Sequence, residues 1–172
     1  MGCPSIGIYS YELIHFYGCK NLIRVGTAGA LTPDVHVRDM VFAMGACTTS
    51  NFVRLLGLPG DYSPVCSYSL LERAVAAARE RGLSFHVGNV LSSDMFYAPP
   101  KQVQGGMTWA DMGVLAVEME AAALYANAAA AGVNALAVLT ISDSMVTGEA
   151  TSAMERETSF TQMMEVALSL VS

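Results

Sequence analysis

An arginine directly before a glycine-bounded segment is a combination that suits the binding of an anion. Arg24 lies near the end of the short apolar run 21–25, and Gly26-Thr27-Ala28-Gly29 follows it. Small residues let a ligand approach the backbone, turn amides can donate to it, and a guanidinium adds positive charge and a planar pair of donors. The pattern predicts an anion site here, while an ordinary strand-to-loop turn with a surface arginine fits the same residues.

Two carboxylates separated by one residue suit the binding of a diol. Glu118 and Glu120 directly follow a predicted strand, and in extended backbone their side chains point to the same side. A carboxylate can accept hydrogen bonds from two hydroxyl groups at once. The alternative is structural, because acids are also favoured in the first turn of a helix.

Asp143 follows the most apolar predicted strand, and one arginine downstream could pair with it. Residues 87–172 contain nine acidic residues and only two cationic ones, Lys101 and Arg156. A buried aspartate that exchanges a proton during a reaction needs such a partner to tune its pKa. Asp143 and Arg156 are therefore predicted to be a catalytic pair, or else a salt bridge that ties the last helix to the sheet.

Two loop aromatics complete the set of candidate residues. Phe96 and Tyr97 precede two prolines in a predicted loop, where they could stack on a flat ligand or simply cover the core. The three histidines and four cysteines lack the spacing of metal ligands, so no metal site is expected. Together these features describe a site for a phosphate, a sugar and a heteroaromatic base.

The elements that must position these residues alternate between helix-like and strand-like runs. Helices are expected at 4–17, 70–81, 118–131 and 155–171, and strands at 21–25, 39–44, 84–90, 114–117 and 134–141. This alternation predicts an α/β fold with a mixed, mostly parallel sheet and helices on both faces. Ligands of such folds bind beyond the carboxyl ends of strands. Because the chain opens on a helix, we expect it to lack an N-terminal piece of the fold.

Composition excludes several classes of protein. The 172-residue chain is 53% hydrophobic and 14% charged, with a mean hydropathy of +0.42, which excludes a disordered chain, a coiled coil and a collagen-like polymer. Its net charge of −6 argues against nucleic acid and anionic membrane as partners. No apolar run reaches the ~20 residues of a spanning helix, and the start does not read as a signal peptide. Cysteines without pair spacing favour a reducing cytoplasm, and the apolar composition favours an oligomer.

Five short motifs occur in the order found in a known enzyme family. They are Arg24-Val-Gly-Thr-Ala-Gly29, Met44-Gly-Ala-Cys-Thr48, Ser93-Asp-Met-Phe-Tyr97, Val117-Glu-Met-Glu-Ala-Ala122, and Ser142-Asp143 followed by Glu155-Arg156. In these the chain resembles the bacterial-type, hexamer-forming purine nucleoside phosphorylases over essentially its whole length. The resemblance implies one three-layer nucleoside phosphorylase domain over residues 1–172. Met1-Gly2 is similar to an interior Met-Gly of the family, which implies that the first strands and a phosphate-binding loop are absent.

The resemblance also implies a reaction and a set of site residues. The reaction is the reversible phosphorolysis of purine (2′-deoxy)ribonucleosides to free base and (deoxy)ribose 1-phosphate, with phosphate as co-substrate and no cofactor. Asp143 and Arg156 would be catalytic, with Asp143 protonating N7 of the departing purine. Phosphate would be bound by Arg24, Val25, Gly26 and Thr27, and the nucleoside by Phe96, Val117, Glu118, Met119, Glu120, Ser142 and Asp143. The protein would act in the cytoplasm as a homo-oligomer, a hexamer built as a trimer of dimers.

Other functions stay open beside the phosphorylase. Without the phosphate loop, Arg24 and its turn would have to hold phosphate alone, so the chain could be a catalytically impaired fragment or an assembly subunit. Use of water in place of phosphate would make it a nucleoside hydrolase of the same superfamily. A uridine phosphorylase is the remaining alternative, although Phe96-Tyr97 and Asp143 favour the purine branch.

Overall fold

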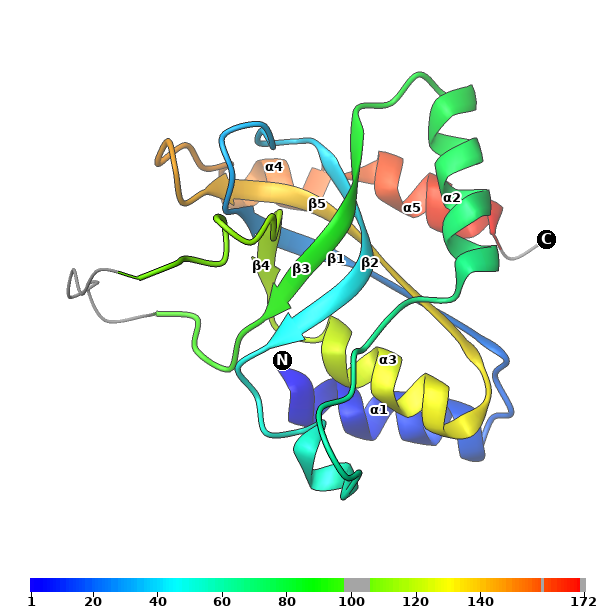
Figure 1. Ribbon diagram of the computed structural model, residues 1–172. Helices are drawn as coiled ribbons and strands as arrows, with labels where there is room; N and C mark the ends of the chain where they lie inside the picture. The colour runs from blue at the N-terminus through cyan, green and yellow to red at the C-terminus, as the bar shows by residue number, and fades with distance from the viewer. Residues whose placement is uncertain (98–105, 159, 171–172) are drawn as a thin grey trace.

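Helices and strands follow one another in the order expected from the sequence (Figure 1). The computed structural model describes residues 1–97, 106–158 and 160–170, with the backbone alone for 156–158. The helices are α1 (Cys3–His15), α2 (Tyr68–Glu80), α3 (Ala121–Ala131), α4 (Ala153–Thr158) and α5 (Thr161–Ser169), with a short 3₁₀ helix η1 (Arg54–Leu56). The strands are β1 (Asn21–Ala30), β2 (Met40–Thr48), β3 (Phe85–Ser92), β4 (Ala116–Glu118) and β5 (Asn134–Ser144). Each expected element has a counterpart.

The five strands form one sheet that curls into a closed barrel in the order β1-β4-β3-β2-β5. Three pairings are parallel (β1–β5, β2–β3 and β3–β4) and two are antiparallel (β1–β4 and β2–β5), which confirms a mixed, mostly parallel sheet. Closure depends on the three-residue strand β4, which pairs only with Gly29–Ala30 of β1 and Val90–Ser92 of β3. Beyond β4, residues 21–28 of β1 therefore have no described strand on that side.

Helices cover both faces of the sheet, and the strand residues alternate between two cores (Figure 1). In β5, Ala135, Ala137 and Leu139 belong to the first core, with residues of α1 and α3, whereas Leu136 and Val138 belong to the second, with residues of α2 and α5. Side chains of a strand point alternately to its two faces, so a strand covered on both faces is apolar throughout. This explains the continuous apolar run of β5 and confirms the expected helices on both faces.

A buried tyrosine joins α3 to the sheet. The Tyr125 hydroxyl donates to the carbonyl of Ala43 at 2.6 Å and accepts from the amide of Ala137 at 2.9 Å. Ala43 and Ala137 form the end pair of the β2–β5 ladder, so the hydroxyl satisfies both backbone groups where these two strands diverge. Burial raises the pKa of this hydroxyl, which keeps its proton available for donation. Tyr125 thereby joins α3 to β2 and β5.

The prediction of a glycine-bounded turn at residues 26–29 is wrong. Parallel pairing with β5 continues from Asn21 to Ala30, with one irregularity after Ala28, so the glycines lie within β1. The ladder with β5 provides partners for this backbone over its whole length, which is why the strand does not end at Val25.

Two helix boundaries also differ from expectation. α3 begins at Ala121, because the residues before it form the corner that joins β4 to the helix. The closing helix is divided into α4 and α5, and Phe160, buried in the second core, takes a non-helical conformation before α5.

Candidate functional site

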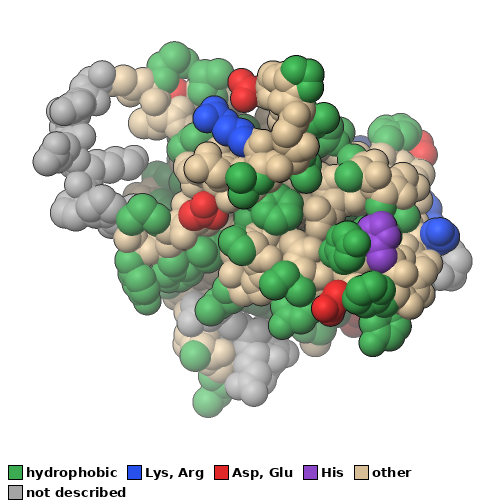
Figure 2. Space-filling model, turned by 90° about the horizontal axis from the view of Figure 1, so that it is seen from below, with side chains coloured by type: hydrophobic (Ala, Val, Ile, Leu, Met, Phe, Trp, Pro, Cys, Tyr) green, Lys and Arg blue, Asp and Glu red, His purple; other side chains and the backbone are tan. Residues whose placement is uncertain are grey.

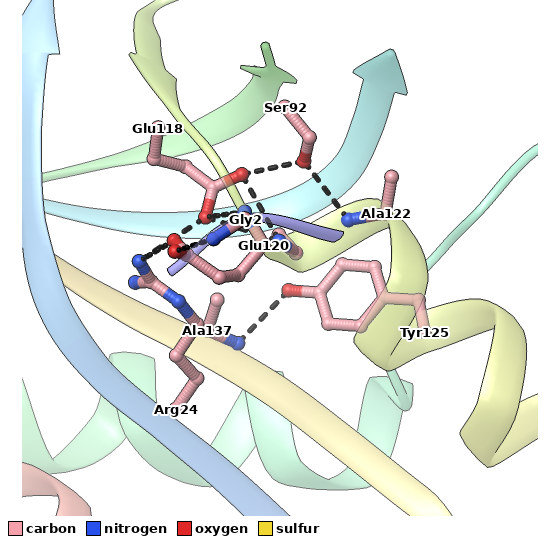
Figure 3. A network of polar contacts seen from close by, with 9 residues as sticks. Gly2, Arg24, Ser92, Glu118, Glu120, Ala122, Tyr125 and Ala137 are labelled. Carbon is pink, nitrogen blue, oxygen red and sulfur yellow. Dashed lines mark hydrogen bonds and ion pairs between the residues drawn. The ribbon is translucent and has the colours of Figure 1, made fainter. Parts of the chain in front are cut away.

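The corner between β4 and α3 is built around the carboxylate of Glu118. Its oxygens accept hydrogen bonds from the amides of Glu120 at 2.9 Å and Ala121 at 3.0 Å, and from the Ser92 hydroxyl at 2.5 Å (Figure 3). The amides of the first helical turn have no partner within the helix, so an acceptor at this point satisfies them. Ser92 in turn accepts from the amide of Ala122 at 2.9 Å. The side chain of Glu118 is fully buried and engaged at the start of α3.

Arg24 extends from β1 to this corner and meets both carboxylates. Its Nη2 forms an ion pair with Glu120 and lies 3.4 Å from Oε2 of Glu118 (Figure 3). Its Nη1 is buried and has no hydrogen-bond partner among the described residues. The guanidinium packs over Gly26, where an added Cβ would lie 2.9 Å from Cζ of Arg24. A side chain at position 26 would therefore require the guanidinium to shift, and the arginine retains one donor that is unused among the described residues.

Glu120 is held in its ionised form by its neighbours. Burial by itself raises the pKa of this carboxyl, but the hydrogen bond from the Gly2 amide and the charge of Arg24 outweigh it, so that the pKa is lowered. Gly2 donates to Oε1 at 2.7 Å, and Arg24 contacts Oε2. Each carboxylate oxygen has a second lone pair, so Glu120 can still accept from hydroxyl groups.

A second group of candidate residues gathers around Gly29 in β1. Val117 of β4 and Asp143 of β5 are its register partners on either side. An added Cβ on Gly29 would lie 2.9 Å from Cε of Met145, 3.0 Å from Oδ2 of Asp143 and 3.5 Å from Cγ1 of Val117, so all three side chains lie over this glycine. Ser142 donates its hydroxyl hydrogen to Oδ1 of Asp143 at 2.7 Å. A carboxyl, a serine hydroxyl and an apolar side chain thus converge at the ends of neighbouring strands.

Other predicted residues are not brought into these contacts. Phe96 is 73% exposed and packs edge-on against Tyr97, with ring centroids 4.9 Å apart. Thr27 is exposed, and because side chains alternate along a strand, it points to the opposite face of β1 from Arg24. Met119 is half-buried in the bend between β4 and α3. The side chain of Arg156 lies outside the described residues, so its pairing with Asp143 stays a prediction.

Sequence reasoning missed two residues that contact the candidate site. Ser92 follows the predicted strand 84–90, and a hydroxyl at the end of a strand parallel to β4 could have been placed beside Glu118. Gly2 gives no such signal, because a backbone amide acts here and any residue other than proline has one.

Three further findings concern metal sites, membrane-spanning helices and cavities in the described part of the chain. No group of three or more His, Cys, Asp or Glu residues there could hold a metal ion. No helix there is long and apolar enough to cross a membrane. A cavity of about 440 Å³ lies between the end of β2 and the loop that follows it, and none of the predicted site residues lines it.

Comparison with known proteins gives a consistent result. A sequence profile of the phosphorylase superfamily matches residues 1–172. The chain is similar to the DeoD-type purine nucleoside phosphorylase of Clostridium novyi (strain NT), with 53% identity over 170 residues that cover 99% of this chain and 72% of the relative. It is also similar to the protein of the same name from Bacillus cytotoxicus, with 54% identity over 169 residues that cover 98% of this chain and 71% of the relative.

Proposed function

The chain belongs to the phosphorylase superfamily, and from that premise we propose that it is a purine nucleoside phosphorylase. It cleaves purine (2′-deoxy)ribonucleosides with inorganic phosphate to give free base and (deoxy)ribose 1-phosphate, in a reversible step of nucleoside salvage. Residues 1–172 act as one domain, and phosphate is a co-substrate rather than a cofactor. The observation that carries the proposal is the contact between Arg24 and Glu120, which joins an anion-binding group to a diol-binding one.

Phosphate binds beside Arg24 in this proposal. The buried, unpartnered Nη1 of Arg24 supplies a charged donor, and a guanidinium matches the geometry of phosphate oxygens. The backbone of Val25, Gly26 and Thr27 lies in the part of β1 that no described strand covers on the side of β4. Amides directed to that side can donate to the same anion.

The ribose binds at the corner before α3. Glu120 accepts hydrogen bonds from the 2′- and 3′-hydroxyls, and Met119 packs against the sugar. Cleavage of the glycosidic bond develops positive charge on the sugar, which the ionised Glu120 and the phosphate stabilise. The low pKa of Glu120 keeps this charge in place at neutral pH.

The purine binds over Gly29, between Val117 and Asp143. Val117 and Phe96 line the base pocket, together with Ser142 and the backbone of Glu118, whose carboxylate is already engaged. Asp143 donates a proton to N7 of the base as negative charge develops there, which can contribute about 10²–10⁴-fold in rate. Arg156 assists Asp143 from α4. The absence of a side chain on Gly29 leaves room for the carboxyl to approach.

The protein acts in the cytoplasm as a homo-oligomer, a hexamer built as a trimer of dimers. Figure 2 shows the molecule from below, where hydrophobic side chains are spread over the surface with few charged side chains among them. The exposed apolar side chains of α1 and the residues after it are Ile8, Tyr9, Tyr11, Leu13, Phe16 and Tyr17. Exposed apolar surface of this kind is typical of contacts between subunits.

The proposed reaction is tested by release of free base from inosine and adenosine by the purified chain, with and without phosphate. We expect release that depends on phosphate, and we expect Asp143→Asn to lower its rate by about 10²-fold or more. Release without phosphate would instead indicate a hydrolase. No release in either condition would indicate a catalytically silent chain.

A further inference from the structure

We infer that Glu118 and Ser92 are positioning residues that hold the phosphate side and the ribose side of the site in register. The inference rests on the proposed function, because it concerns how the same two ligands are bound. Neither residue needs to touch the reacting atoms. Their effect is transmitted through the side chains and the backbone that they fix.

The carboxylate of Glu118 is in contact with three separate parts of the chain (Figure 3). Ser92 reaches it from the end of β3, Arg24 from β1, and the amides of Glu120 and Ala121 from the start of α3. All of these groups are donors or cations, so a fully buried carboxylate has its charge compensated. Removal of Glu118 would leave all of these groups without their common acceptor, whereas removal of one donor leaves the others in contact with it.

This arrangement determines the orientation of Glu120. The Glu120 amide donates to Glu118 at 2.9 Å, and the Ser92 hydroxyl links Glu118 to the amide of Ala122 at 2.9 Å. Backbone anchors thus lie at and just after the residue that accepts from the sugar. The amide of Ser93 also donates to the Glu118 carbonyl at 2.8 Å, which anchors the start of the loop that carries Phe96.

The charge of Glu118 has an opposite consequence for the anion. Oε2 of Glu118 lies 3.4 Å from Nη2 of Arg24, so a buried negative charge stands beside the group that binds phosphate. A like charge near an anion site weakens binding of the anion. Glu118 therefore favours the sugar by orienting Glu120 and disfavours the phosphate by its charge.

Two substitutions separate these effects. Glu118→Gln removes the charge and replaces one acceptor oxygen by a donor, so the dissociation constant for inosine is expected to rise about tenfold while that for phosphate falls. Ser92→Ala removes two hydrogen bonds, the one to Glu118 and the one from the Ala122 amide, and leaves the charges unchanged. The dissociation constant for inosine is therefore expected to rise, while that for phosphate stays the same. Tyr125→Phe is the matched control, since it removes a buried hydroxyl of α3 whose hydrogen bonds go to the backbone of Ala43 and Ala137 rather than to Glu118 or Ser92.

The measurement is isothermal titration calorimetry of the full chain with inosine alone and with phosphate alone, beside the thermal midpoint of each variant. Tyr125→Phe is expected to lower the midpoint and to leave both dissociation constants unchanged. Opposite shifts for the two ligands in Glu118→Gln support the inference, because loss of stability alone cannot produce them. If Glu118→Gln does not fold, Ser92→Ala decides the question with its unequal shifts.

The inference is overturned if either variant weakens inosine and phosphate binding equally, or leaves inosine binding unchanged. In those cases wild-type binding of both ligands would leave the proposed function intact. A wild-type chain that binds neither inosine nor phosphate would refute the proposed function and the inference together.

Discussion

Two clusters in this molecule each place one arginine against two glutamates, and they differ in burial. The side chains of Arg24, Glu118 and Glu120 are 14%, 0% and 14% exposed. Arg38 contacts Glu149 at 3.2 Å and Glu155 at 2.7 Å, and these three side chains are 57%, 56% and 27% exposed. The same charges therefore interact in a medium of low effective dielectric constant in the first cluster and largely in water in the second.

The two clusters have the same number of charges, so the difference in burial determines how strongly those charges interact and how they must be compensated. A buried charge must be compensated by hydrogen bonds, and the first cluster supplies backbone amides and the Ser92 hydroxyl for this purpose. An exposed ion pair gains little electrostatic energy in water and costs side-chain freedom, so it contributes little to the free energy of unfolding. The first cluster therefore has a geometry fixed by several hydrogen bonds, whereas the second consists of ion pairs that are largely exposed to water.

The largest expected effect is that of removing the buried arginine. Arg24→Ala leaves the carboxylates of Glu118 and Glu120 without their cation, and we expect a loss of about 3–5 kcal/mol in the free energy of unfolding. Urea unfolding at neutral pH measures this loss. A decrease below about 1 kcal/mol would contradict the account, because that is the range of exposed pairs.

A smaller effect is expected where the backbone makes room for that arginine. Gly26→Ala introduces a Cβ that would lie 2.9 Å from Cζ of Arg24, so the guanidinium must move, at a cost of about 1–3 kcal/mol. Thr27→Ala is the control, because its exposed side chain should matter by no more than about 0.5 kcal/mol. Equal unfolding midpoints for the two variants would argue against the packing described for Arg24.

The pH dependence of stability should report the ionisation of Glu120, whose carboxylate is partly buried beside Arg24. Its pKa in the folded protein is lowered from the ordinary value of 4.5, so its stabilising contribution is fully present above about pH 4.5 and is lost as pH falls through the lower, folded pKa. We expect Glu120→Gln to flatten the decline of the unfolding free energy below that pH. Identical profiles for wild type and Glu120→Gln, recorded by thermal melts from pH 3 to 7, would contradict this.

The smallest effect is expected in the exposed cluster. Arg38 adopts a left-handed backbone conformation, with φ of 80°, which disfavours every residue except glycine. Arg38→Ala should leave the unfolding midpoint unchanged, and Arg38→Gly should raise it slightly, since the backbone strain is relieved. If both variants lost as much unfolding free energy as Arg24→Ala, the exposed ion pairs would stabilise the fold as strongly as the buried ones, and the comparison would be wrong.

The fold could be predicted from the sequence because its signals are local. The apolar run 134–141 and the glycines at 82 and 132 predict a buried strand and two helix ends, and the structure has all three. The glycines at 26 and 29 predicted a turn, but they lie in β1, because pairing with the distant strand β5 decides their conformation. Such long-range pairing is not visible in the residues themselves.

The candidate site could be predicted in its residue types but not in its contacts. The spacing of Glu118 and Glu120 left a diol site and a helix start as equal alternatives. The structure places Glu118 at the start of α3 and Glu120 beside Arg24, and the binding of a diol by Glu120 stays a prediction. Glycine at position 26 reads as a turn residue in the sequence, whereas its role depends on a side chain that folds back over it. Spacing shows which residues can meet, and packing determines which do.

The most direct test of the central claim joins the two clusters to the proposed reaction. Arg24→Lys and Arg38→Lys both keep the positive charge and remove the planar fork of donors. Phosphate-dependent release of base from inosine should fall by about 10²-fold in Arg24→Lys, as for loss of a positioned donor, and stay at the wild-type rate in Arg38→Lys. Equal rates in the two variants would contradict the claim that the buried cluster is the site of the reaction.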